Sequence, residues 1–177
     1  IPEGSLLLGE KIGEIMEAHH LYVIGYYDSG NRIIAPKLTN KITSKCRIAI
    51  LGQRETVQEM VYDHGLTLLP ALDVFAEDFA ATKAGVAEIV VPANSSFIGK
   101  TAREMDFRQT FGLSLLAIHR TGDTFSYVET EDHEATRIGV IPFQAGDTLV
   151  VHTPWERLIQ VKKNRNLVVV TTDFPQE

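Results

Sequence analysis

The sequence predicts an α+β fold made of two tandem lobes, each with the element order β-α-β-β-β-α. Two observations predict it: the same order of strand, turn and helix signals occurs twice within 177 residues, and apolar residues recur at helical spacing between runs of β-forming residues. A lobe of this size would bury only about 60% of its surface if it folded alone. We therefore expect the lobes to pack as a pseudo-dimer that shares a core and protects its sheet edges.

The first lobe is predicted over residues 1–69. Ile12, Ile15 and Met16 form one apolar stripe of a helix that ends at the His19-His20 pair, and turn residues at 28–31 connect two strands as a hairpin. The predicted elements, in order, are a strand end and turn at 1–5, a helix at 10–17, strands at 21–27, 32–35 and 47–51, and a helix at 55–64 closed by Gly65.

A connecting segment is predicted over residues 70–86. Leu72, Phe75 and Phe79 fall on one helical stripe, with Glu77 on the other side. Gly85 suits the C-terminal cap of a helix. The pattern therefore predicts a linker helix that packs against one or both lobes.

The second lobe is predicted over residues 87–177. Ser5 matches Ser95, Gly9 matches Gly99, residues 21–30 align with 113–122, and residues 47–57 align with 148–158. The predicted elements are strands at 89–91, 113–118 and 167–171, a long strand after the Gly146-Asp147 turn, helices at 100–109 and 156–163, and a long acidic hairpin tip at 126–139. This second use of one plan indicates a tandem duplication.

Composition and charge exclude several classes of protein. The net charge is −6 with no basic block, which argues against a nucleic-acid surface and against an anionic membrane surface. The single cysteine, Cys46, cannot form an internal disulfide, so we expect a reducing compartment. No apolar run reaches the ~18 residues of a membrane span. Because the chain starts at Ile1 inside a strand-turn pattern, we interpret it as a fragment of a longer protein.

The sequence contains no motif that predicts catalysis. It has no Gly-rich phosphate loop, no nucleophile elbow and no zinc signature, so we expect a protein that is not an enzyme and that holds no metal. The acidic run at residues 131–134 is local and lacks the spaced, convergent ligands of a metal site, and it is better explained as a solvated loop tip. Trp155 and Leu158 are expected in a core or an interface.

Three polar motifs each have a structural and a functional interpretation. Ser95 with Gly99, like Ser5 with Gly9, is either a helix cap and turn or a small-anion site at a helix N-terminus. Arg120 either lies at a solvated strand end or contacts a phosphate through both branches of its guanidinium. Gly146-Asp147 is expected to be a tight turn that sets the strand register.

The motifs of the second lobe resemble those of the TrkA C-terminal domain, also called RCK-C. The resemblance rests on these residues: Pro92, Ser95, Gly99, Lys100, Thr101, Gly112, Ala117, Ile118, Arg120, Gly122, Gly146, Asp147 and Leu149. The first lobe keeps Pro2, Ser5, Gly9 and Gly30. It departs from the pattern at Asp28, where the family has Arg, and it lacks the Gly-Asp turn.

The resemblance implies a role in membrane transport. Such domains are cytosolic appendages of ion channels and transporters, and tandem pairs resemble the insert of bacterial sodium-coupled sulfate or dicarboxylate permeases (divalent anion:sodium symporters). It therefore implies a regulatory, ligand-sensing pair at the cytoplasmic face of the bacterial inner membrane, with regulation of cation transport also implied. The expected partners are the transmembrane domain of the same polypeptide and a second copy in a homodimer, without nucleic acid. The alternative is a structural dimerisation module that senses nothing.

The resemblance also implies a ligand site. In some relatives a cyclic dinucleotide lies in a groove between two such domains, against the strand that corresponds to residues 113–118. Carried over by position, the ligand-binding residues are Leu115, Ala117, His119, Arg120, Val23, Gly25, Tyr27 and Pro36. No resident cofactor is expected, and the effector would be a small anion or a nucleotide.

Overall fold

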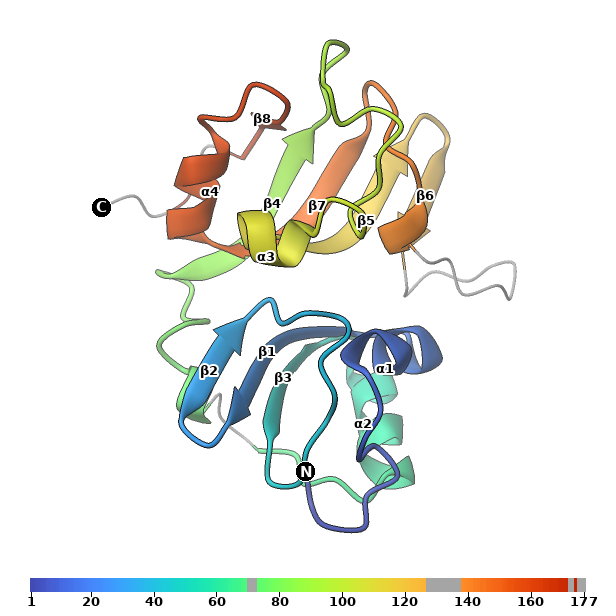
Figure 1. Cartoon of the computed structure of the whole chain (residues 1–177), viewed down its shortest axis with the longest axis vertical. Helices are drawn as coiled ribbons and strands as arrows, with labels where there is room; N and C mark the ends of the chain where they lie inside the picture. Colours follow the sequence, from blue (N-terminus) through green and yellow to red (C-terminus); the bar gives the residue numbers. More distant parts are fainter. Residues whose placement is uncertain (70–72, 127–137, 172–173, 175–177) are drawn as a thin grey trace. The chain divides into compact units, whose positions relative to one another are not determined.

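The computed structural model describes the whole chain except residues 70–72, 127–137, 172–173 and 175–177. The chain forms two compact units, Ile1–Glu77 and Asp78–Glu177. Each unit contains one antiparallel sheet with helices, so the mixed α and β content of the prediction is confirmed (Figure 1). Among the described residues, no helix has the length and apolar character needed to cross a membrane.

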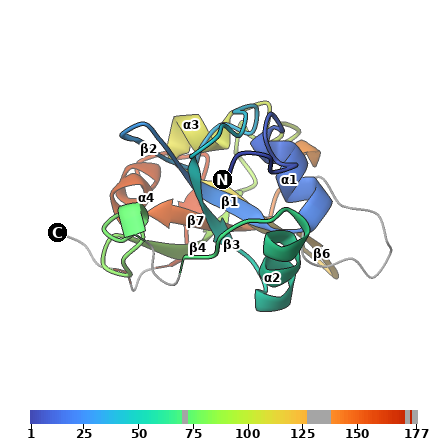
Figure 2. The same cartoon turned by 90° about the horizontal axis from the view of Figure 1, so that it is seen from below.

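The first unit has a three-stranded sheet in the order β2-β1-β3, which places β3 at an edge. Its elements are α1 (Ile12–His19), β1 (Tyr22–Asp28), β2 (Asn31–Ile34), β3 (Arg47–Leu51), α2 (Arg54–Asp63) and the short 3-10 turn η1 (Asp73–Phe75). The two helices lie together against one side of the sheet (Figures 1 and 2). Ile12, Ile15 and Met16 are buried, as the apolar stripe predicts.

The second unit has a five-stranded sheet in the order β6-β5-β7-β4-β8. Its elements are β4 (Ala84–Val90), α3 (Phe107–Phe111), β5 (Ser114–Arg120), β6 (Asp123–Ser126), the 3-10 turn η2 (Ile138–Val140), β7 (Thr148–Pro154), α4 (Trp155–Val161) and β8 (Val168–Val169). The core includes two fully buried residues of β7. Leu149 pairs with Ile89 and Ile118, and Val151 pairs with Ala87 and Leu115, which are all buried. Phe107 and Phe143 add a ring contact with centroids 5.2 Å apart.

The two units contain the same pattern of long-range backbone hydrogen bonds. Gly9 N donates to Ile42 O and Ile42 N to Glu10 O, while Gly99 N donates to Phe143 O and Phe143 N to Lys100 O. Lys45 N donates to Ile1 O, as Gly146 N does to Val91 O. These bonds pair Ile1 with Val91 and Gly9 with Gly99, which agrees with the alignment of the two halves of the sequence.

A bulge at the same position in β1 and in β5 extends this correspondence. β1 pairs with β3 with a register shift between Val23 and Gly25, and β5 pairs with β7 with a register shift between Leu115 and Ala117. One extra residue at a bulge moves the following side chains to the opposite face of the sheet. Therefore Leu115 shares a face with Val151, whereas Ala117 shares the other face with Val150.

The predicted linker helix over residues 70–86 was wrong for the part of that range that the structure describes. Residues 73–75 form only a 3-10 turn, and Ala84–Val90 is strand β4, with Gly85 inside it. The apolar residues of the supposed stripe belong to different units: Phe75 lines a cavity of the first unit, and Phe79 contacts His152 of the second unit. Helical spacing is therefore coincidental here, because these side chains have separate partners.

The helix predicted at residues 100–109 is shorter than expected and comprises only Phe107–Phe111. Arg103 N donates to Gly139 O instead of to a carbonyl one helical turn earlier, and Asp106 has a left-handed backbone with φ 50°. Both features interrupt a regular helix before residue 107. Residues 127–137 of the predicted acidic tip, including the whole 131–134 run, lie outside the described residues.

The ends of α1 and α2 are joined by two histidines. His19 Nε2 lies 3.0 Å from His64 Nε2, and the two rings meet edge to face with centroids 4.8 Å apart. Burial, and next the positive charge of His64, lower the pKa of His19 below its ordinary value of 6.5, while Glu10 and Asp63 act in the opposite direction. The folded first unit therefore favours neutral His19.

We expect the first unit to lose stability as the pH falls from 7 to 5. Because the folded state binds protons at His19 less readily than the unfolded chain, its contribution is complete above the unfolded pKa and is lost progressively below it. Thermal unfolding at a series of pH values, with amide signals of α1 as the probe, measures this effect. His19→Gln should make the stability of the first unit depend less on pH. The pH dependence of the second unit, to which buried His152 contributes, should stay unchanged. An unchanged slope would contradict the assignment.

Candidate functional site

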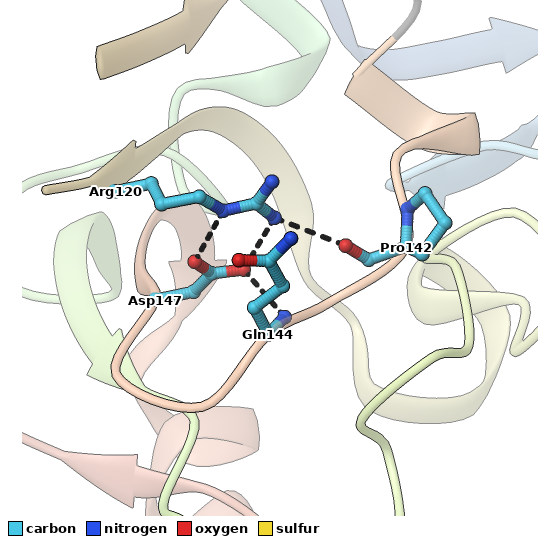
Figure 3. A network of polar contacts seen from close by, with 4 residues as sticks. All are labelled: Arg120, Pro142, Gln144 and Asp147. Carbon is cyan, nitrogen blue, oxygen red and sulfur yellow. Dashed lines mark hydrogen bonds and ion pairs between the residues drawn. The ribbon is translucent and has the colours of Figure 1, made fainter. Parts of the chain in front are cut away.

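An ion pair lies at the end of β5, where the sequence placed a candidate phosphate contact. Arg120 Nε donates to Asp147 Oδ1 at 2.8 Å, and Arg120 Nη2 donates to Asp147 Oδ2 at 2.9 Å and to Pro142 O at 3.0 Å. Gln144 N donates to the same Oδ2 at 2.8 Å. Figure 3 shows the guanidinium and the carboxylate facing each other inside the turn that precedes β7.

The Arg120–Asp147 pair is built into the fold. The Asp147 side chain is fully buried and that of Arg120 is 21% exposed. The hydrogen bonds to Asp147 raise the pKa of Arg120, and the guanidinium also lies 5.3 Å from the centre of the Phe125 ring. Through these hydrogen bonds, Arg120 connects the turn at 142–147 to the β5–β6 hairpin. The Gly146-Asp147 turn, expected only to set register, also supplies the acid of this pair.

The first unit replaces this ion pair by hydrogen bonds between an acid and hydroxyl groups. Asp28 takes the position of Arg120, and Cys46 that of Asp147. Thr43 Oγ1 donates to Asp28 Oδ2 at 2.7 Å, and Tyr26 Oη lies 3.1 Å from Thr43 Oγ1. The hydrogen bond from Thr43 lowers the pKa of Asp28, and burial raises the pKa of the Cys46 thiol. One backbone plan therefore holds two different polar networks.

The Ser-Gly turns are held by their own hydroxyl groups. Ser95 Oγ donates to Asn166 O at 2.8 Å and accepts from Phe97 N at 3.1 Å. Ser5 Oγ makes the corresponding bonds to His64 O and from Leu7 N. Gly99 and Gly9 have φ +85° and +83°, a left-handed conformation that favours glycine. These contacts support the structural interpretation of the turn rather than an anion site.

The predicted ligand residues lie on β1 of the first unit and on β5 of the second, apart from Pro36, which follows β2. In the second unit, Leu115 is buried on the face it shares with Val151, whereas Ala117 and exposed His119 share the opposite face. His119 Nδ1 lies 2.9 Å from Thr124 Oγ1 on β6. In the first unit the bulge divides Val23 from Gly25 in the same way. The groove between the two repeats stays a prediction.

A cationic row that the sequence analysis missed crosses the first sheet. Tyr27 pairs with Arg32 on β2 and with Arg47 on β3, so the three side chains lie on one face in one line across the sheet. The Arg47 guanidinium lies 6.0 Å from the centre of the Tyr27 ring, and Arg32 Nη1 donates to Val74 O at 3.1 Å. Both arginines are exposed. The second unit has Thr124, His119 and Thr148 at the matching positions.

This row offers two cations beside an aromatic ring, which suits a small anion or a phosphorylated ring compound. The hairpin register would have placed Arg32 opposite Tyr27, because Asp28 and Asn31 flank a two-residue turn. Arg47 comes from a strand whose register the sequence does not give. Within the described part of the chain, no group of three or more His, Cys, Asp or Glu side chains could hold a metal ion.

Part of the chain matches a known protein family. Residues 86–165 match the family model of the TrkA-C domain. This TrkA-C segment runs from β4 to the residues after α4 and includes the bulge of β5, His119 and the Arg120–Asp147 pair. The resemblance drawn from the second lobe is thereby confirmed for this segment.

A curated relative matches nearly all of the chain. It is an uncharacterized transporter of Synechocystis sp., 22% identical over 178 residues that cover 96% of this chain and 28% of the relative. The chain thus spans 28% of the length of that relative. Both units, and not only the TrkA-C segment, lie within the matched region.

Two solved structures share a weak likeness with the chain. The GsuK RCK domain is 12% identical with a TM-score of 0.37, and the alignment covers 90% of this chain and 61% of the GsuK chain. BusR of S. agalactiae, solved in complex with its busAB-promotor DNA, has a TM-score of 0.36 and 15% identity, over 62% of this chain and 49% of its own.

Proposed function

We propose that this chain is a regulatory, ligand-sensing pair of TrkA-C domains that belongs to a membrane ion transporter. The observation that carries the proposal is the TrkA-C match at residues 86–165. The transporter relative, which aligns with 96% of the chain, gives this domain its context. A sodium-coupled sulfate or dicarboxylate permease is the transporter class we propose. The module then lies at the cytoplasmic face of the bacterial inner membrane, binds its effector and does not catalyse a reaction.

The first unit is, in this proposal, a second and divergent TrkA-C copy. The shared backbone hydrogen bonds, the shared bulge and the shared serine contacts support this interpretation. The two copies differ where an ion pair in one replaces hydroxyl hydrogen bonds in the other. Such divergence after duplication lets one copy keep a structural role while the other gains a binding role.

The proposed effector is a small anion that binds the face carrying Arg32, Tyr27 and Arg47. Two guanidinium groups attract an anionic group, and the Tyr27 ring offers a stacking surface to a nucleotide base. In the second copy, Ala117 and His119 occupy the positions that correspond to Gly25 and Tyr27. The effector acts by population shift: it must bind one arrangement of the two copies more tightly and so bias the attached membrane domain.

Isothermal titration calorimetry with a panel of nucleotides, cyclic dinucleotides and small dicarboxylates tests this proposal. We expect at least one compound to bind, and Arg47→Gln to weaken its binding about tenfold, because a charge-assisted hydrogen bond contributes roughly 1.5 kcal/mol or more. The control is Arg54→Gln, which removes an exposed charge of α2 outside the row and should leave the affinity unchanged.

A folded protein that binds nothing in the panel would contradict the sensing role. Sedimentation equilibrium then tests the alternative function, a structural dimerisation module. A concentration-dependent dimer without ligand binding would support the structural dimerisation module instead. Equal weakening by Arg47→Gln and Arg54→Gln would show that binding follows net charge rather than the row, and would overturn the assigned site.

A further inference from the structure

Two histidines meet where the helices of the first unit end. His19 is the last residue of α1, and His64 is the C-cap of α2, 45 positions later. Figure 1 shows these two helices side by side. Both side chains are half-buried, and the rings meet at 85° with their centroids 4.8 Å apart. The two Nε2 atoms, which come from different helices, therefore lie 3.0 Å from each other.

This spacing suits the coordination of a single metal ion. Imidazole nitrogens lie about 2.0–2.1 Å from a bound Zn²⁺, so two of them at roughly 90–109° around one ion are roughly 2.9–3.4 Å apart. The distance of 3.0 Å between the two Nε2 atoms falls in this range. Imidazole is a preferred ligand of Zn²⁺, Ni²⁺ and Cu²⁺. The pair is thus spaced as a two-point chelate for a divalent transition-metal ion.

The surroundings of the pair also favour a cation. Burial, and next the charge of His64, lower the pKa of His19, so its ring favours the neutral form that binds metals, while the carboxylates of Glu10 and Asp63 act in the opposite direction and attract positive charge. Among the described residues, the buried Nδ1 of His64 has no hydrogen-bond partner. It has none whether the Nε2 atoms share a hydrogen or an ion, so metal binding adds no new unsatisfied atom.

The second unit has no such pair at the matching positions. The serine contacts make Asn166 the counterpart of His64. Phe111 is the counterpart of His19, because each is the last residue of a helix with a left-handed C-cap. The Phe111 ring packs against Phe107, with centroids 5.4 Å apart. The backbone arrangement that the two units share therefore does not require the two histidines.

We propose that His19 and His64 bind a divalent transition-metal ion, such as Zn²⁺ or Ni²⁺, which joins the end of α1 to the end of α2. The pair supplies fewer protein ligands than a structural or catalytic zinc site, so water or a small anion completes the coordination and the binding is weaker. This inference departs from the sequence-based expectation of no metal, because ligands 45 positions apart form no recognisable motif. It does not depend on the proposed function.

A titration of the 177-residue chain with Zn²⁺ near neutral pH, followed by long-range ¹H–¹⁵N NMR spectra of the histidine rings, tests the proposal. We expect the Nε2 signals of His19 and His64 to shift together with one apparent affinity. His19→Gln should weaken the zinc binding seen at His64 at least about tenfold, because it removes one of the two ligands. The matched control is His20→Asn, since asparagine tolerates the left-handed backbone of this C-cap, and it should leave the affinity unchanged.

The joining role has its own measurement. At a zinc concentration ten times the Kd, amides that exchange when α1 separates from α2 should exchange about tenfold more slowly, because the ion binds only the closed pair.

Three results would overturn the proposal. The first is a titration of the unsubstituted chain in which the His19 and His64 signals do not shift, a result that needs no variant to fold. The second is equal weakening by His19→Gln and His20→Asn, which would show that single exposed imidazoles bind the ion. The third is saturation with zinc that leaves the exchange at the ends of α1 and α2 unchanged.

Discussion

Replacing Arg120 by methionine is expected to lower the free energy of unfolding of the second unit by about 3 kcal/mol. The change leaves the fully buried Asp147 carboxylate without its cation, and removing one partner of a buried ion pair costs roughly 3–5 kcal/mol. The low end applies because 21% of the Arg120 side chain is exposed. Urea unfolding followed by amide signals of β5 and β7 measures the loss.

The control for this prediction is Arg103→Met, which removes an exposed guanidinium of the same unit. It should change stability by no more than about 0.5 kcal/mol. The double variant Arg120→Met, Asp147→Asn should recover at least about 1 kcal/mol, because it removes the unpaired charge together with its partner. If Arg120→Met and Arg103→Met had equal effects, the pair would be a surface contact and not part of the fold.

Replacing Gly85 by valine is expected to destabilise the second unit by about 3 kcal/mol. A Cβ at this position would lie 2.5 Å from Cζ2 and 2.7 Å from Cη2 of Trp155. The indole cannot easily move, because its Nε1 donates to Ala81 O at 2.8 Å and its ring stacks on Phe174 with centroids 5.3 Å apart. Overpacking a filled site costs typically 1–3 kcal/mol, and a rigid neighbour favours the upper end.

Gly139→Ala is the matched control for Gly85→Val. The Cβ added there meets only Arg103 Cβ, at 3.8 Å, so we expect a change within about 0.5 kcal/mol. Trp155→Leu should make room for the new valine, so the double variant should lose less stability than the sum of the single losses. Additive losses would show that the indole and residue 85 do not compete for space.

The sequence predicted most of the secondary structure where local signals and packing agree. The hairpin of β1 and β2, strand β3 at Arg47–Leu51, and helix α2 followed by Gly65 all formed close to their expected positions. The sequence also predicted that Ser5 corresponds to Ser95, and the two hydroxyl groups make equivalent hydrogen bonds. In each case the signal lies in neighbouring residues.

The failures concern features that depend on distant residues. The stripe of Phe75 and Phe79 predicted a helix, but the two rings have partners in different units. The bulge in β5 has no glycine to mark it, so the separation of Leu115 from Ala117 was not foreseen. Arg120 was a candidate ligand contact because the sequence does not show that Asp147 meets it across 27 positions. In the row of Arg32, Tyr27 and Arg47, the hairpin register gives the first pair, but the register that brings Arg47 beside Tyr27 is not readable from the sequence.

We propose that the first half of the chain repeats the backbone plan of the TrkA-C segment, and through-hydrogen-bond scalar couplings measured by NMR test this proposal most directly. We predict couplings from Gly9 N to the carbonyl of Ile42 and from Lys45 N to that of Ile1. Their counterparts should run from Gly99 N to Phe143 and from Gly146 N to Val91. Couplings confined to the second set, with folded signals throughout, would contradict the claim that the first unit repeats the second.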